Sequence, residues 1–141
     1  MRRFATYVIA VTMLAGAVVS AQKVTTPEEL DKTMKAVGAS QGATGKAINS
    51  MAYADAAKSV AATKALLMDA ENFWVVNKKD DAVKMSKDTI ANLDKLAAIL
   101  AAPTVDQAAA LGALKGAGCG SCHAVYRGGE PPNYTIKPGA I

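Results

Sequence analysis

The spacing of apolar residues in four stretches, separated by short breakers, restricts the fold of this 141-residue sequence more than any other feature. Ahead of the first stretch, Thr26-Pro27-Glu28-Glu29 combines an N-cap threonine, a proline at the first helical position and the glutamate of a capping box. The apolar residues that follow recur at helical spacing, at Leu30, Met34, Val37, Thr44 and Ile48. A helix is therefore predicted. It contains three glycines, each costing about 1 kcal/mol relative to alanine, which indicates close approach of another helix or a cofactor.

Three further stretches follow the same pattern. The second helix is expected from residue 53 or 55 to 73, with Ala56, Val60, Thr63, Leu67 and Ala70 on one face. After a polar break, the third has Val83, Ser86, Ile90, Leu93, Ala97 and Leu100 on its apolar face. Pro103 ends it, and Thr104-Val105-Asp106-Gln107 is a second capping box that opens a fourth helix reaching about Arg127. Short connections between such helices predict an all-α, antiparallel up-down-up-down four-helix bundle, a fold that places cofactors between facing helices.

The N-terminal residues have the features of an export signal. Arg2 and Arg3 precede an apolar run over residues 7–19, and Val19-Ser20-Ala21 is a small-residue cleavage site. The alternative is a retained membrane anchor, but the run is shorter than the ~20 residues of a spanning helix. We therefore expect a signal peptide over residues 1–21, a mature domain over 22–128 and a tail over 129–141. Loss of Arg2 and Arg3 lowers the net charge from +4 to +2, too little for nucleic-acid binding.

The two cysteines carry the main chemical signal. In an exported chain they would ordinarily predict a disulfide, but Cys119 and Cys122 are three residues apart and His123 follows directly. This spacing is typical of covalent haem attachment, because residues three apart on a helix are neighbours and the imidazole is next to them. One covalent haem c is predicted, with His123 on its iron. A redox dithiol is disfavoured because no strand-helix-strand pattern accompanies the motif.

His123 is the only histidine, so a second histidine ligand from the same chain is excluded. Methionine, lysine or no ligand remains for the other side of the iron. Met34 is the preferred candidate because it lies in the apolar stripe beside the glycines of the first helix, and a His/Met pair is an established haem ligation. The alternative for Met34 is a gap-filling core residue. The other methionines after the signal, Met51, Met68 and Met85, are expected in the core or on the surface.

The segment from Cys119 to Arg127, in which an aromatic and a basic residue follow the haem motif, resembles the C-terminal end of class II cytochromes c. This family comprises cytochrome c′ and its methionine-ligated low-spin relatives. The resemblance implies haem attachment near the end of the last helix, His123 as proximal ligand, Met34 facing the distal side, and Arg127 near the imidazole and propionates. It also implies a homodimer formed through the first two helices. The chain differs in having Leu30 where many members have arginine.

These features predict a periplasmic, bacterial one-electron carrier that serves redox partner proteins and is not an enzyme. The alternative is a five-coordinate, cytochrome c′-like binder of nitric oxide or carbon monoxide, with Met34 only guarding the distal pocket. A peroxidase is disfavoured because no distal histidine or arginine is placed for acid-base work. The tail is longer than usual for the family. We expect disorder there because proline-rich termini rarely order alone; the alternative is that Tyr134 and Ile136 cover the haem edge.

Overall fold

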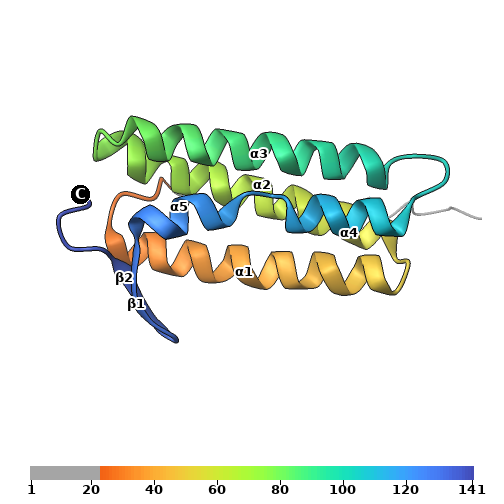
Figure 1. Cartoon of the computed structure of the whole chain (residues 1–141), viewed down its shortest axis with the longest axis horizontal. Coiled ribbons are helices and arrows are strands. Elements are labelled where there is room, and N and C mark those ends of the chain that lie inside the picture. Colours follow the sequence, from red (N-terminus) through yellow and green to blue (C-terminus); the bar gives the residue numbers. More distant parts are fainter. Residues whose placement is uncertain (1–22) are drawn as a thin grey trace, which may run out of the picture.

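The computed structural model describes residues 23–141, so the expected signal peptide lies outside the described residues. Helices dominate this part of the chain and pack side by side as a bundle (Figure 1). Their bounds are α1 (Pro27–Asn49), α2 (Tyr53–Val76), α3 (Asp80–Leu100), α4 (Gln107–Lys115) and α5 (Cys119–Tyr126). Two short strands follow, β1 (Arg127–Glu130) and β2 (Asn133–Ile136). The prediction of a mainly helical bundle is confirmed. No helix within residues 23–141 is both long and apolar enough to span a bilayer.

The capping box at the start of α1 forms as predicted. The Thr26 hydroxyl accepts a hydrogen bond from the Glu29 backbone N–H at 3.2 Å, and the Glu29 carboxylate accepts one from the Thr26 N–H at 3.1 Å. Pro27 occupies the first turn, where its missing N–H costs nothing. The start of α1 therefore follows from a local sequence signal.

The predicted stripes of α1 and α2 face the core, apart from Met34, which is half-buried. On α3 the buried face lies partly elsewhere, at Ala82, Ser86, Thr89, Leu93, Leu96 and Leu100. Thr89 can be buried because its hydroxyl donates to the Met85 carbonyl at 2.9 Å within the same helix. Val83, Ile90 and Ala97, which were expected on this face, are only half-buried. Small residues on both sides of the stripe made the two faces hard to distinguish from sequence.

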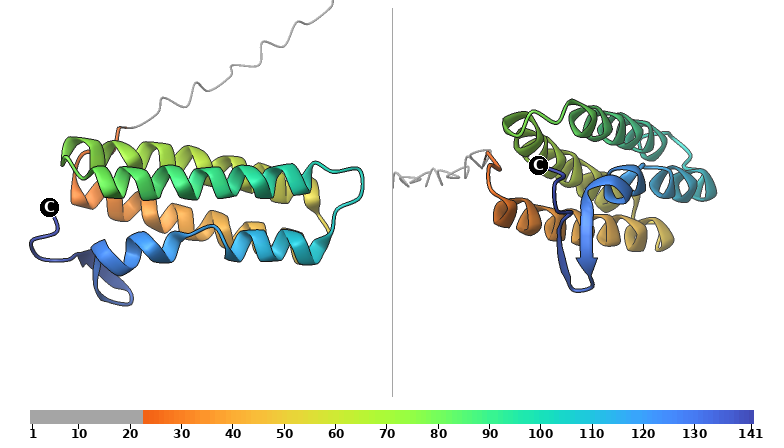
Figure 2. Two further views of the ribbon diagram at one scale, coloured as in Figure 1. Left: turned by 45° about the horizontal axis from the view of Figure 1, so that its top comes forward. Right: turned by 60° about the vertical axis from the view of Figure 1, so that its left-hand side comes forward.

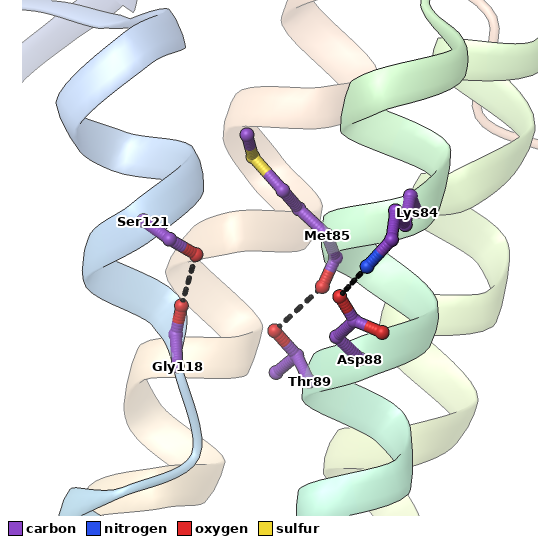
Figure 3. A network of polar contacts seen from close by, with 6 residues as sticks. All are labelled: Lys84, Met85, Asp88, Thr89, Gly118 and Ser121. Atoms are coloured by element: carbon purple, nitrogen blue, oxygen red, sulfur yellow. Dashed lines mark hydrogen bonds and ion pairs between the residues drawn. The ribbon is translucent and has the colours of Figure 1, made fainter.

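The fourth helix is interrupted, which corrects the prediction of one continuous helix. A break at residues 116–118 separates α4 from α5, with Gly118 at φ +90°, a left-handed conformation that favours glycine. The Ser121 hydroxyl donates to the Gly118 carbonyl at 2.7 Å in the first turn of α5 (Figure 3). The N-cap of α4 is also Asp106 rather than Thr104, and its side chain accepts from the Ala109 N–H at 3.0 Å. The haem motif therefore has a short helix of its own.

The expected disorder of the tail is wrong for residues 129–136, which form a hairpin together with residues 127 and 128. The hairpin is antiparallel and pairs Arg127 with Ile136 and Glu130 with Asn133, and Figure 2 shows it projecting beside the start of α1. Ile136 packs against a core cluster made by Val24, Leu30, Ala70, Phe73, Trp74, Ala82 and Tyr126. Lys137 follows β2, and its N–H donates to the Tyr126 carbonyl at 2.8 Å. Apolar burial and a backbone bond to α5 thus order a segment that its composition alone would leave free.

Candidate functional site

A cavity of about 610 Å³ opens between α1, α3, α5 and the hairpin. Its size falls within the roughly 300–1,000 Å³ typical of small-molecule and cofactor sites. All of the site residues expected from sequence line this cavity, namely Met34, Cys119, Cys122, His123 and Arg127. Residues far apart in sequence are therefore brought to one place, on walls that are largely apolar.

Both cysteines are half-buried free thiols on α5. The Gln41 side-chain amide on α1 lies 3.1 Å from the Cys119 sulfur and donates to it. Burial, with smaller contributions from Asp81 and Cys119, raises the pKa of Cys122 to about 11, so this thiol is protonated at neutral pH. The pair presents two sulfur atoms from consecutive turns of α5 to one cavity.

His123 is half-buried beside the thiols. Burial lowers its pKa, and the positive charge of Arg127 lowers it further. Both effects favour the neutral imidazole, which is the form that binds metal ions. His123 also lines a second, more open cavity of about 550 Å³ between α5 and the hairpin, together with Arg127 and Tyr134.

Contacts of Tyr126 hold α5 in place. Its hydroxyl donates to a carboxylate oxygen of Asp81 on α3 at 2.6 Å, and its ring lies 4.6 Å from the Trp74 ring, centroid to centroid. Burial and the bond to Asp81 raise the pKa of Tyr126 to about 12, and the same bond lowers the pKa of Asp81. The last turn of α5 is therefore tied to both α2 and α3 only three residues after His123.

The four methionines of the described chain divide into two pairs. Met51 and Met68 are exposed at 67% and 62%. Met34 and Met85 are half-buried and both line the cavity, from α1 and from α3. Met34 thus shares the cavity with Cys119, Cys122 and His123, and its position opposite the imidazole stays a prediction. Sequence reasoning placed Met85 in the core or on the surface and did not anticipate its position on the cavity wall.

The glycines of α1 have different surroundings. A Cβ added to Gly45 would lie 3.5 Å from the Leu114 side chain, an ordinary van der Waals contact, so the packing of α1 on α4 does not require glycine there. Gly38 lines the cavity, and a Cβ there would meet no atom within 4 Å. Gly42 has equally open surroundings but lies outside the cavity lining. Of the three, only Gly38 lines the cavity.

Sequence reasoning missed several residues of the cavity wall, or left their role open. Gln41 lies on the same α1 face as Met34 and Gly38, so helical periodicity could have found it. Trp74 reaches the cavity from α2. Tyr134, Thr135 and Ile136 line it from the hairpin, and the Arg127 guanidinium carbon lies 4.3 Å from the centroid of the Tyr134 ring. Only the alternative given for the tail, that Tyr134 and Ile136 pack over this region, pointed to the hairpin.

Among residues 23–141, no group of three or more histidine, cysteine, aspartate or glutamate side chains could hold a metal ion. A haem iron requires no such group, because the porphyrin supplies most of its ligands. Comparison of the chain with protein-family models, curated proteins and solved structures gave no match. The interpretation of the site therefore rests on its residues and their arrangement.

Proposed function

We propose that this protein is an exported monohaem c-type cytochrome that carries one electron at a time. The observation that supports this function best is the convergence of Cys119, Cys122, His123 and Met34 on a single, largely apolar cavity. The haem motif alone predicts attachment. Its placement against a cavity of cofactor size is independent support, since a surface dithiol would need no such space.

The residues present fit a covalent haem. The thiols of Cys119 and Cys122 would form thioether bonds to the two vinyl groups, and neutral His123 would bind the iron from the same side. Gly38 leaves room for the ring on the α1 wall, because no side chain fills that space. In this proposal α4 and α5 together make the last helix of an antiparallel up-down-up-down bundle, and the haem is attached near its end, as in class II cytochromes c.

When bound, the haem supplies a reversible one-electron change between ferric and ferrous iron. The chain sets how readily that change occurs. Leu67, Trp74 and Ile136 line the cavity with apolar surface that keeps water away, and the Met34 thioether opposite the imidazole would raise the potential. Arg127 lies at the exposed end of α5, where its charge is available to the propionates.

Export to the bacterial periplasm fits the N-terminal signal and covalent haem attachment. Redox partner proteins would deliver and remove the electron, with no role for nucleic acid and no membrane anchor after signal cleavage. The family resemblance adds a homodimer formed through α1 and α2 to this proposal.

The second candidate function is a five-coordinate binder of nitric oxide or carbon monoxide. It is favoured by the packing of Met34 against both core clusters, one around Trp74 and the other around Ile48, Val60 and Leu93. With these contacts the Met34 side chain would stay in the core instead of binding the iron. The open space at Gly38 would then receive the small ligand.

Absorption spectra of the reduced holoprotein test the two functions against each other. For the carrier, we expect sharp low-spin bands that Met34→Ala abolishes and that the exposed control Met68→Ala leaves unchanged. A high-spin ferrous spectrum in the wild type, with carbon monoxide bound and no ligand displaced, would favour the gas binder. Colourless protein at the mass of the bare polypeptide, purified from cells that mature c-type cytochromes, would refute both.

A further inference from the structure

The cavity contains a second thioether, Met85, whose surroundings differ from those of Met34. Met34 packs against both core clusters, whereas within residues 23–141 Met85 packs against neither. Met85 is nevertheless half-buried and lines the cavity. Figure 3 shows its side chain extending from α3 toward the space in front of α1, on the side of α5. The Met85 side chain therefore lies at the cavity without being part of either core cluster.

Two contacts between α3 and α5 give the level of Met85 along the bundle. Tyr126 is hydrogen-bonded to Asp81, and a Cβ on Gly118 would lie 3.7 Å from the Thr89 hydroxyl. Residue numbers increase along α3 in the direction in which they decrease along α5, so the two helices are antiparallel. Met85 is midway between Asp81 and Thr89, and Cys122 is midway between Gly118 and Tyr126. Because both helices advance equally per residue, the backbone of Met85 lies level with that of Cys122.

Two polar contacts close to Met85 do not involve its side chain. Thr89 donates to the Met85 carbonyl at 2.9 Å, and Lys84 forms an ion pair with Asp88 at 2.6 Å on the exposed surface of α3 (Figure 3). None of these groups needs the Met85 side chain as a partner. At the level of Cys122, α3 thus offers the cavity an apolar, polarisable thioether.

We propose that Met85 is a haem-contacting residue whose thioether packs against the porphyrin beside the Cys122 attachment and excludes water from that edge. This inference rests on the proposed function and assigns Met85 a packing role distinct from iron ligation by Met34. Water near the ring stabilises the more positive ferric iron, so a dry contact raises the reduction potential. Loss of the contact should lower the potential and leave the axial ligands unchanged.

Three substitutions in the holoprotein test the packing role, and the exposed Met68→Ala is the matched control. Met85→Ala opens a space beside the ring, Met85→Gln introduces an amide of similar length, and Met85→Leu keeps apolar volume without sulfur. We expect a lower potential for Met85→Ala and Met85→Gln in redox titrations, and a potential close to the wild-type value for Met85→Leu and Met68→Ala. All four variants should keep the wild-type haem content and spin state.

The outcomes separate this inference from the proposed function. If the wild type binds no haem, the proposed function fails. If haem is present and Met85→Ala and Met85→Gln have the potential of Met68→Ala, only the role of Met85 is overturned. Loss of the low-spin bands in Met85→Ala, with their retention in Met34→Ala, would also overturn it, because Met85 would then be the iron ligand.

Discussion

Gly38 and Gly42 provide a matched test of where the haem lies. Both are exposed positions within α1, and an added Cβ would meet nothing within 4 Å at either. Replacing a helical glycine by alanine stabilises a helix by about 1 kcal/mol, chiefly by restricting the unfolded chain. In the haem-free Cys119→Ser/Cys122→Ser form, Gly38→Ala and Gly42→Ala should therefore each raise the free energy of unfolding by about 1 kcal/mol. For a domain of this size, that gain corresponds to a melting temperature about 4 °C higher.

The haem should separate the two variants. Gly38 lines the cavity and Gly42 does not, so only the Gly38→Ala methyl group would meet the porphyrin. Overpacking costs about 1–3 kcal/mol, enough to cancel or exceed the helix gain. We expect Gly42→Ala to stabilise the holoprotein by the same amount as the haem-free form, and Gly38→Ala to lose its gain there. A bulkier Gly38→Leu should reduce the yield of haem-loaded protein.

Urea unfolding followed by far-ultraviolet circular dichroism measures all of these free energies of unfolding. The m-value shows whether a variant exposes a different amount of surface on unfolding. The informative quantity is the difference in free energy of unfolding between Gly38→Ala and Gly42→Ala. It is measured once in the haem-loaded form and once in the haem-free form. Equal effects of Gly38→Ala and Gly42→Ala in both forms, together with normal haem loading of Gly38→Leu, would refute a haem lying against this face of α1.

Two further predictions concern the elements that hold α5. Because the pKa of Tyr126 is raised from about 10 to about 12, its hydroxyl contributes stability that is present below pH 10 and lost as the pH rises to 12. Tyr126→Phe should reduce this alkaline loss in urea unfolding, and an unchanged profile would contradict the role of the bond to Asp81. Ile136→Ala should cost about 1–2 kcal/mol, less than a fully buried isoleucine, and should speed proteolysis of the hairpin. Ile141→Ala, at an exposed isoleucine, is its control, and equal effects would contradict the anchoring of the hairpin.

Local signals predicted the helices well. The capping box at Thr26 and the stripes of α1 and α2 agree with the structure because they depend on neighbours within one or two turns. The same holds for the proximity of Cys119, Cys122 and His123, since residues three and four apart meet on any helix. Helix breaking was harder to predict. The helix α4 ends at Lys115 with Gly116 as its C-cap, and α5 begins after Gly118, which adopts a positive φ. Composition alone does not reveal that conformation.

Residue spacing along single helices is enough to predict a mainly helical chain with two thiols and an imidazole gathered on one short segment. What faces that segment depends on how the helices pack. The packing of α1 and α3 on either side of α5 selected Met34 and Met85 for the cavity and left Met51 and Met68 in solvent. Ile136 joined the wall because it packs against the core cluster that includes Trp74 and Tyr126, and such packing depends on the whole fold rather than on any local pattern.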